Sequence, residues 1–228
     1  MYSTKKNLQV LHEDNHIIVV NKRAGDIVQG DKTGDKPLSD VVKEYIKEKY
    51  NKPGAVFLGT VHRLDRPTSG IVIYARTSKA LERLNKMLRE KTIKKTYWAV
   101  VKNPPKKTSD TLINFLKKNP KNNKSTAYSK EIDGSKKAIL HYQVLKELDN
   151  YSLLEIDLET GRHHQIRVQL SNIGTTIKGD LKYGAKRSNK DGSIHLHARK
   201  IEFIHPVSKE LIKINAPTPK ESIWDACS

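Results

Sequence analysis

One acidic side chain, Asp65, lies between two arginines in the string T-V-H-R-L-D-R-P-T-S-G, residues 60–70. A guanidinium close to a carboxyl group favours the ionised form of that carboxyl. An ionised carboxylate can act as a nucleophile or as a general base. The same residues also fit an Asp–Arg ion pair that fixes a turn, because such pairs are common outside active sites. The string therefore offers a catalytic candidate and an ordinary structural alternative.

The residues after Asp65 predict where it lies. Pro67 lacks a backbone donor and disfavours helical geometry at Arg66, while Gly70 tolerates backbone angles that other residues avoid. Residues 71–75 form a short apolar run that is typical of a buried strand. We therefore expect Asp65 on a loop or strand end that leads into the core, where a rigid scaffold can fix a catalytic group.

Composition limits the classes of function. The 228 residues include 43 lysines and arginines against 25 acidic residues, which gives a formal net charge of +18. This balance favours an acidic partner, of which nucleic acid is the commonest. The single cysteine, Cys227, excludes an internal disulfide framework and a cysteine-based metal cluster.

No membrane or export signal is evident in the sequence. The N-terminal residues are not followed by the apolar segment of a signal peptide. No apolar run approaches the ~20 residues that span a bilayer. We therefore expect a cytoplasmic protein without a membrane partner, and we expect it to act as a monomer.

Hydrophobic periodicity predicts strands alternating with a few helices. Ser78 is the expected cap of the second helix, and Gly174 is expected just after the end of the third. The predicted strands are residues 8–11, 16–20, 71–75, 95–101, 140–145, 151–158, 194–204 and 211–216, and the predicted helices are 37–50, 78–91 and one with Ile166, Leu170 and Ile173 on its apolar side.

Residues 102–137 differ from the rest, because they contain ten lysines and three acidic residues. We interpret this segment as an insertion or hairpin and not as a separate domain. It could be a solvated surface loop, or it could be a basic finger that closes on RNA phosphates. The sequence supports both interpretations equally.

Several strings together resemble the RluA-type pseudouridine synthases, which convert uridine in RNA into its C-glycoside isomer. They are H-R-L-D-x-x-T-S-G at 62–70, T-G-R-H-H-Q-I-R at 160–167 and G-D-L-K-Y-G at 179–184. A further string, N-K-R-A-G at 21–25, departs from the family's N-K-P-x-G, because Arg23 replaces the usual proline. We expect a looser turn there and one more phosphate contact.

The resemblance implies roles for individual residues. Asp65 corresponds to the catalytic residue of the family, Arg167 to the arginine that pairs with it, and Tyr97 to a tyrosine that stacks on the target base. Arg63 is expected to fill the space that the flipped base leaves. His62 and Arg162, from the same strings, are further expected substrate contacts.

The resemblance leaves the chemical step of Asp65 open. The carboxylate attacks the sugar, attacks the base, or removes a sugar proton. No cofactor and no metal is expected, because an isomerisation needs neither a redox step nor a second reactant. The expected partner is structured RNA, either ribosomal or transfer RNA.

The implied fold is the α+β pseudouridine synthase fold, a bent, mainly antiparallel mixed sheet flanked by helices with a central RNA-binding cleft. The resemblance runs from about residue 11 to residue 217. We therefore interpret residues 1–10 as an N-terminal extension and residues 11–228 as the catalytic domain. We expect no S4 RNA-binding domain of the kind that many relatives carry before the catalytic domain, because ten residues are too few for one.

Three alternatives remain. A non-catalytic RNA-binding module would explain the charge but not the string around Asp65. His195 and His197 alternate on a predicted strand and share one face, so with His163 or His164 they could ligate zinc. A metal-dependent nuclease would need clustered acids, and the acids of this chain are dispersed.

Overall fold

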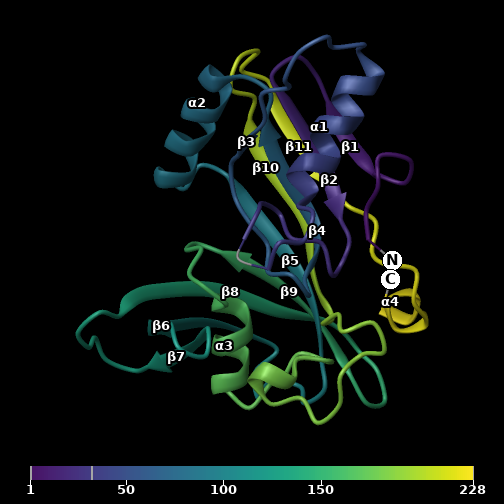
Figure 1. Cartoon of the computed structure of the whole chain (residues 1–228). Coiled ribbons are helices and arrows are strands. Elements are labelled where there is room, and N and C mark those ends of the chain that lie inside the picture. The colour runs from purple at the N-terminus through teal and green to yellow at the C-terminus, as the bar shows by residue number, and fades with distance from the viewer. Residues whose placement is uncertain (1, 32, 228) are drawn as a thin grey trace. The chain divides into compact units, whose positions relative to one another are not determined.

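A computed structural model describes residues 2–31 and 33–227 (Figure 1). The chain divides into two compact units. Unit 1 comprises Met1–Ile93 and Ala198–Pro219, and unit 2 comprises Lys94–His197 and Lys220–Ser228. The N-terminal extension and the start of the predicted catalytic domain both fall within unit 1.

Unit 1 is built on a sheet in which the strands follow the order β1-β2-β4-β10, with β3 beside β4 and β11 beside β10. Every residue of β2 and β4 is buried, as the apolar run at 71–75 predicts for β4. The strands are β1 (Val10–Glu13), β2 (Ile17–Lys22), β3 (Gly59–Thr60), β4 (Ser69–Ala75), β10 (Leu196–Ile204) and β11 (Leu211–Asn215). The first two residues of β10 belong to unit 2.

Two helices of unit 1, α1 (Leu38–Lys49) and α2 (Ser78–Arg89), follow the predicted periodicity (Figure 1). The cap of α2 was predicted one residue too late. The side chain of Thr77, and not that of Ser78, accepts a hydrogen bond from the backbone N–H of Ala80 at 3.2 Å. Helix α2 also ends before the predicted Lys91, which adopts a left-handed φ of 57°.

Unit 2 contains an antiparallel sheet with the order β5-β9-β8-β6-β7. Helix α3 packs against β6 and β7, and the side chain of Gln169 on α3 donates to the carbonyl oxygen of Leu112 at 3.1 Å. The elements are β5 (Lys94–Val101), β6 (Ser109–Asn119), β7 (Lys124–Tyr128), β8 (Lys136–Glu147), β9 (Ser152–Leu158), α3 (Gln165–Asn172), the 3-10 turn η1 (Leu181–Tyr183) and α4 (Ser222–Cys227).

Some predicted boundaries were wrong for local reasons. Residues 12 and 13 continue β1 and do not form a turn. The turn begins at Asp14, whose carboxylate accepts from the backbone N–H groups of His16 and Ile17 at 2.6 and 2.9 Å. Ile173 was expected on the buried side of α3, but it caps the helix and is 37% exposed.

The α+β class and the antiparallel character of the predicted fold are confirmed, because helices accompany both sheets and the strand pairs described within each unit are antiparallel. The lysine-rich segment contains the paired strands β6 and β7. The central cleft stays a prediction.

Among the described residues, no helix is long and apolar enough to cross a bilayer.

Gly70 is required where β4 approaches β10. Its φ is +113°, and a Cβ at this position would lie 2.4 Å from the carbonyl oxygen of Ala198 and 2.5 Å from the amide nitrogen. We expect Gly70→Ala to lower the free energy of unfolding by about 3 kcal/mol or more, because backbone strain and overpacking add. Urea denaturation measures this change.

Gly54→Ala is the matched control, because a Cβ there meets nothing within 4 Å. It should change the free energy of unfolding by less than about 1 kcal/mol. Equal effects of the two substitutions would contradict the role assigned to the β4–β10 contact.

Candidate active site

The loop that carries Asp65 connects β3 to β4, as expected. Asp65 is half-buried, and its carbonyl oxygen accepts the backbone N–H of Thr68 at 3.0 Å, which closes a turn over Arg66 and Pro67. The side chain of Arg63 is exposed. The sequence therefore places a partly accessible carboxylate next to an exposed arginine on a turn that leads into a buried strand.

His62 is fixed to the same strand. Its ring atom Nε2 accepts the backbone N–H of Ile73 on β4 at 3.1 Å, and the side chain is half-buried. This bond orients the ring and occupies one of its two nitrogens. The predicted contact between His62 and substrate stays a prediction.

A buried lysine, Lys22, holds the backbone of the Asp65 loop. Its side chain is 1% exposed, and its Nζ donates to the carbonyl oxygens of Arg66 and Thr68 at 3.1 and 2.7 Å and to that of Arg23 at 3.0 Å. An ammonium group has three protons, so these carbonyls can accept all of them. Lys22 belongs to the string N-K-R-A-G, but the sequence did not reveal that its amine lies beneath the loop.

Burial lowers the pKa of Lys22 to about 7, because the charged form loses its hydration. The negative charges of Asp26 and Asp65 act in the opposite direction and stabilise the ammonium. The charge of Lys22 and the charge of Asp65 therefore influence one another within unit 1.

The turn after β2 is bonded directly to the Asp65 loop. The backbone N–H of Gly25 donates to the carbonyl oxygen of Arg66 at 2.8 Å, and Nε of Arg66 donates to the carbonyl oxygen of Gly25 at 3.1 Å. The Arg66 guanidinium also pairs with Asp35, and this hydrogen bond lowers the pKa of the Asp35 carboxyl. The residue that follows Asp65 is thus anchored by both its backbone and its side chain.

In unit 2, Arg167 lies on α3 and is buried. Its Nε and Nη2 donate to the two carboxylate oxygens of Asp180 at 2.7 and 2.8 Å. The guanidinium carbon lies 5.1 Å from the centre of the Tyr183 ring. Asp180 and Tyr183 come from the string G-D-L-K-Y-G. That string could have indicated a partner for Arg167, but the sequence analysis did not identify Asp180 in this role.

The loop before α3 is closed by Gln165. Its Oε1 accepts from the hydroxyl of Thr160 at 2.7 Å and from the backbone N–H of Arg162 at 3.0 Å. Nε of Arg162 donates to the carbonyl oxygen of Lys137 at 2.9 Å, and the side chain remains exposed. The exposed side chain of Arg162 is accessible to a substrate, and the predicted contact between them stays a prediction.

The two histidines of this loop have structural partners. His163 Nδ1 lies 2.9 Å from the hydroxyl of Ser125, and His164 Nδ1 lies 2.8 Å from the hydroxyl of Tyr183. Their rings stack with centroids 3.7 Å apart. His164 has a left-handed φ of 54°, which turns the chain into α3.

Tyr97 is buried on β5, opposite Ile156 of β9. Lys95 precedes it by two residues and therefore shares its face of the strand. Nζ of Lys95 lies 3.6 Å from the position of a Cβ on Gly161, and burial lowers the pKa of this lysine. The stacking role of Tyr97 stays a prediction, and Lys95 is a basic neighbour that the sequence analysis did not single out.

The zinc alternative finds no support in the described part of the chain, where no group of three or more His, Cys, Asp or Glu side chains is placed to hold a metal. His195 and His197 are buried beside the ring of Trp224, at centroid distances of 5.4 and 6.0 Å. Burial lowers the pKa of His195 to about 4. Both rings pack against α4 of unit 2.

The predicted site residues fall in both units. Asp65, Arg63 and His62 belong to unit 1, and Tyr97, Arg162 and Arg167 belong to unit 2. The predicted pairing of Arg167 with Asp65 would join residues of different units and stays a prediction.

Residues 16–172 match the family model for RNA pseudouridylate synthase. An uncharacterized RNA pseudouridine synthase of Synechocystis sp. is 35% identical over 216 residues, which cover 93% of this chain and 66% of that protein. Ribosomal large subunit pseudouridine synthase C of Buchnera aphidicola is 35% identical over 227 residues, which cover 95% of this chain and 69% of that protein.

Solved structures show the same fold. Human RNA pseudouridylate synthase domain containing 4 superimposes with a TM-score of 0.77 at 23% identity, covering 93% of this chain and 89% of that chain. Human RNA pseudouridylate synthase domain containing 1 gives 0.75 at 22% identity, covering 100% and 90%. The predicted pseudouridine synthase fold is therefore confirmed.

Lys22→Met tests the buried amine. The substitution leaves the carbonyl oxygens of Arg23, Arg66 and Thr68 without this donor, so the free energy of unfolding should fall by about 2–4 kcal/mol. The folded-state pKa of Lys22 is lowered from 10.5 to about 7, so between these values the unfolded chain binds the additional proton and stability rises with pH. Below about pH 7 the cost of burying the charge is present in full.

The measurement is urea denaturation of both proteins from pH 6 to pH 10. The difference in unfolding free energy between wild type and Lys22→Met should grow above about pH 7, with a slope of at most about 1.4 kcal/mol per pH unit. A constant difference would mean that the carbonyl cage keeps Lys22 charged throughout.

Proposed function

Because this chain belongs to the RNA pseudouridylate synthase family, we propose that it isomerises specific uridines in structured RNA to pseudouridine with Asp65 as the catalytic residue. The observation that carries this assignment is the fixed loop around Asp65. Lys22, Gly25 and the Arg66 side chain hold the backbone on its C-terminal side, and the carboxylate itself is only half-buried. A fixed backbone with an accessible carboxylate suits a group that must meet a substrate.

The reaction explains why an accessible arginine lies beside the acid. A uridine inside an RNA stack is out of reach of a side chain, so an enzyme that acts on the base takes it out of the stack. The exposed Arg63, two residues from Asp65, can occupy the space that the base leaves. Tyr97 is the proposed surface on which the flipped uracil stacks.

The atoms balance without a second reactant. The bond between N1 of uracil and C1′ of the ribose breaks, the uracil turns, and its C5 bonds to C1′. The proton on C5 leaves and N1 carries a proton in the product, so no electron acceptor or group donor enters. Asp65 starts the cleavage by attack on the sugar, attack on the base or removal of a sugar proton.

A role is also proposed for Arg167, which lies on α3 of unit 2. A guanidinium favours the ionised form of a nearby carboxylate, which is the role proposed for Arg167 toward Asp65. Its pairing with Asp180 also makes it structural, since removing one member of a buried ion pair costs about 3–5 kcal/mol. Arg167→Ala therefore combines both effects, and Asp65 is the cleaner residue to test.

The RNA itself is proposed at a coarser level. Ribosomal and transfer RNA are both candidates, and ribosomal RNA is the first to try, because the relatives from Buchnera aphidicola and Zymomonas mobilis are named ribosomal large subunit pseudouridine synthases. We also propose that the protein acts as a cytoplasmic monomer. Comparison of uridine modification maps from cells with and without the gene would identify the RNA.

Asp65→Asn tests the catalytic assignment, because it keeps the shape of the side chain and removes its charge and its basic oxygen. Tritium release from RNA labelled at C5 of uridine should be lost. RNA affinity should remain, since phosphate contacts supply most of it. The melting temperature should also remain, because Asp65 is only half-buried.

Asp133→Asn is the control, because it makes the same chemical change at an exposed acid in unit 2. Its rate should match that of wild type. If the folded, RNA-binding Asp65→Asn protein releases tritium at the wild-type rate, Asp65 is not catalytic. A non-catalytic RNA-binding module would then be the better description.

The hairpin of β6 and β7 supplies a candidate phosphate-binding surface, which we name the basic hairpin and define as residues 109–128. Its lysines Lys117, Lys118, Lys121 and Lys124 are all exposed, and in the described part of the chain none of them forms an ion pair with an acidic side chain. By contrast, Lys36, Lys43 and Lys49 near or on α1 pair with Glu44, Asp40 and Glu13. Charges that are not neutralised by acids are the better candidates for contact with RNA.

Replacing the four basic-hairpin lysines with Ser should reduce the dependence of RNA affinity on salt, because fewer counterions are released on binding. Each lysine that contacts a phosphate contributes about 0.7–0.9 to the slope of log K against log salt. Filter binding at several salt concentrations measures the slope. The control replaces Lys36, Lys43, Lys47 and Lys49 with Ser and should leave the slope closer to wild type; equal slopes for the two variants would make the basic hairpin an ordinary solvated loop.

A further inference from the structure

The N-terminal segment of unit 1 is hydrogen-bonded to the turn after β2 through one buried serine. Ser3 is 8% exposed, while its neighbours Tyr2 and Thr4 are exposed. Its hydroxyl donates to Oδ2 of Asp26 at 2.6 Å, and its backbone N–H donates to Oδ1 of the same carboxylate at 3.0 Å. Asp26 is itself buried, at 6% exposure. Hydrogen bonds to an ionised acceptor are stronger than those between neutral groups.

A further contact joins the segment to the same turn. The ring of Tyr2 lies over Gly25, so that a Cβ on Gly25 would lie 2.9 Å from Cε1 of Tyr2. The pKa of the Arg66 guanidinium is raised by its hydrogen bond to Asp35 and, to a smaller extent, by Tyr2. We name residues 2–7 the N-terminal strap.

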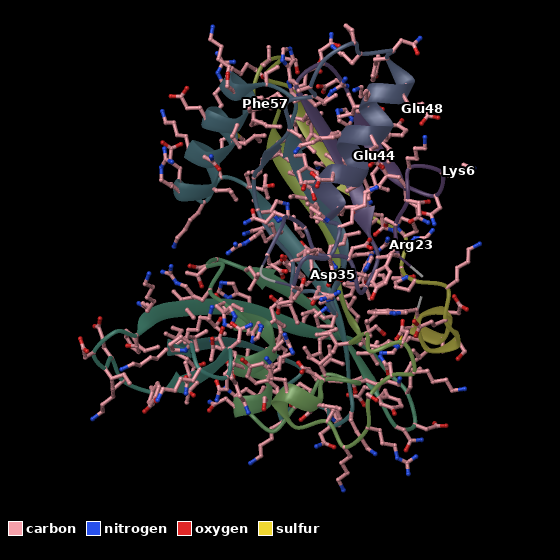
Figure 2. All side chains as sticks on the ribbon, in the orientation of Figure 1. Lys6, Arg23, Asp35, Glu44, Glu48 and Phe57 are labelled. Carbon is pink, nitrogen blue, oxygen red and sulfur yellow. The ribbon has the colours of Figure 1, made fainter. Side chains whose placement is uncertain are left out.

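Arg23 completes the strap from the other side of the turn. Its Nη2 donates to the carbonyl oxygen of Asn7 at 3.3 Å, and the Asn7 side chain accepts the backbone N–H of Thr4 at 2.7 Å. Figure 2 labels Arg23 on this turn and Lys6 on the strap. A proline at position 23 could not donate this hydrogen bond. The arginine that departs from the family string therefore adds a bond between the turn and the strap.

The turn after β2 connects the N-terminal strap to the loop that carries Asp65. Asp26 follows Gly25, whose N–H and carbonyl oxygen both bond to Arg66, and Arg66 follows Asp65 directly. A shift of the turn would therefore move the peptide next to the carboxylate. Misplacement of a reacting group by about 1 Å can lower a rate by roughly a hundredfold.

We propose that Ser3, acting through Asp26, is a positioning residue for Asp65, and that the N-terminal strap sets the geometry of the catalytic loop. The proposal rests on the proposed function of Asp65. Positioning of Asp65 acts on the chemical step, so we expect RNA affinity to stay unchanged when Ser3 is replaced. The strap acts through the buried Ser3 hydroxyl bonded to the Asp26 carboxylate and through the Tyr2 ring that lies over Gly25.

Ser3→Ala removes the hydroxyl and leaves the backbone contact. Under single-turnover conditions with saturating enzyme, the rate of tritium release should fall by roughly tenfold to a hundredfold, while the Kd for RNA stays at the wild-type value. Ser3→Thr, which keeps the hydroxyl, should restore most of the rate. Thr4→Ala is the matched control at the exposed neighbouring side chain and should not change the rate.

Hydrogen exchange separates positioning from general stability. In folded Ser3→Ala protein, the amides of Gly25 and Thr68, which donate to Arg66 and Asp65, should exchange faster, while amides in β9 of unit 2 keep the wild-type rate. If Ser3→Ala does not fold, Tyr2→Ala replaces it, because that side chain is 62% exposed and its removal leaves Ser3 and Asp26 paired. Its rate should fall with unchanged Kd.

The outcomes distinguish this inference from the proposed function. If Asp65→Asn is inactive and the folded strap variants react at the wild-type rate, the strap inference is wrong and the proposed function stands. If Asp65→Asn keeps the wild-type rate, the proposed function fails regardless of the strap. A fall in melting temperature for Ser3→Ala with an unchanged rate would make the strap a structural element alone.

Discussion

The bonding of one buried amine organises the candidate site of unit 1. Lys22 has lost almost all contact with water, and its position is tolerable because backbone carbonyl oxygens of two separate segments accept its protons. A buried polar group without such partners would be costly. The same bonds join the turn after β2 to the loop after Asp65, so the requirement to satisfy the amine fixes the distance between the two segments.

In unit 2, a buried positive charge is compensated by an ion pair. Arg167 is buried on α3, and the two oxygens of Asp180 accept from its guanidinium in a two-bonded arrangement that fixes direction as well as distance. Tyr183 covers the guanidinium and bonds to His164. Each unit therefore satisfies the buried charge of its own motif with its own residues, before any RNA is considered.

The sequence predicted those parts of the fold that local patterns determine. Residues 71–75 are apolar throughout and form the buried β4, and the spacing of Leu38, Val41, Val42 and Ile46 identifies the buried side of α1. The resemblance supplied Asp65, Arg167 and Tyr97 as candidates. Local patterns could not place the amine of Lys22 or the carboxylate of Asp180, because their partners are distant in sequence and only the folded chain brings them together.

The N-terminal strap contains a contact made by Arg23, the residue that departs from the family string. The additional phosphate contact expected of Arg23 stays a prediction, and the structure shows its guanidinium bonded to the carbonyl oxygen of Asn7. Ser3 gave no signal in the sequence, since an isolated serine near a terminus is usually solvated. Its burial against Asp26 follows from the turn that Gly25 makes with a φ of +95° beneath Tyr2. The residues that fix the Asp65 loop are thus partly outside the motifs that identify the family.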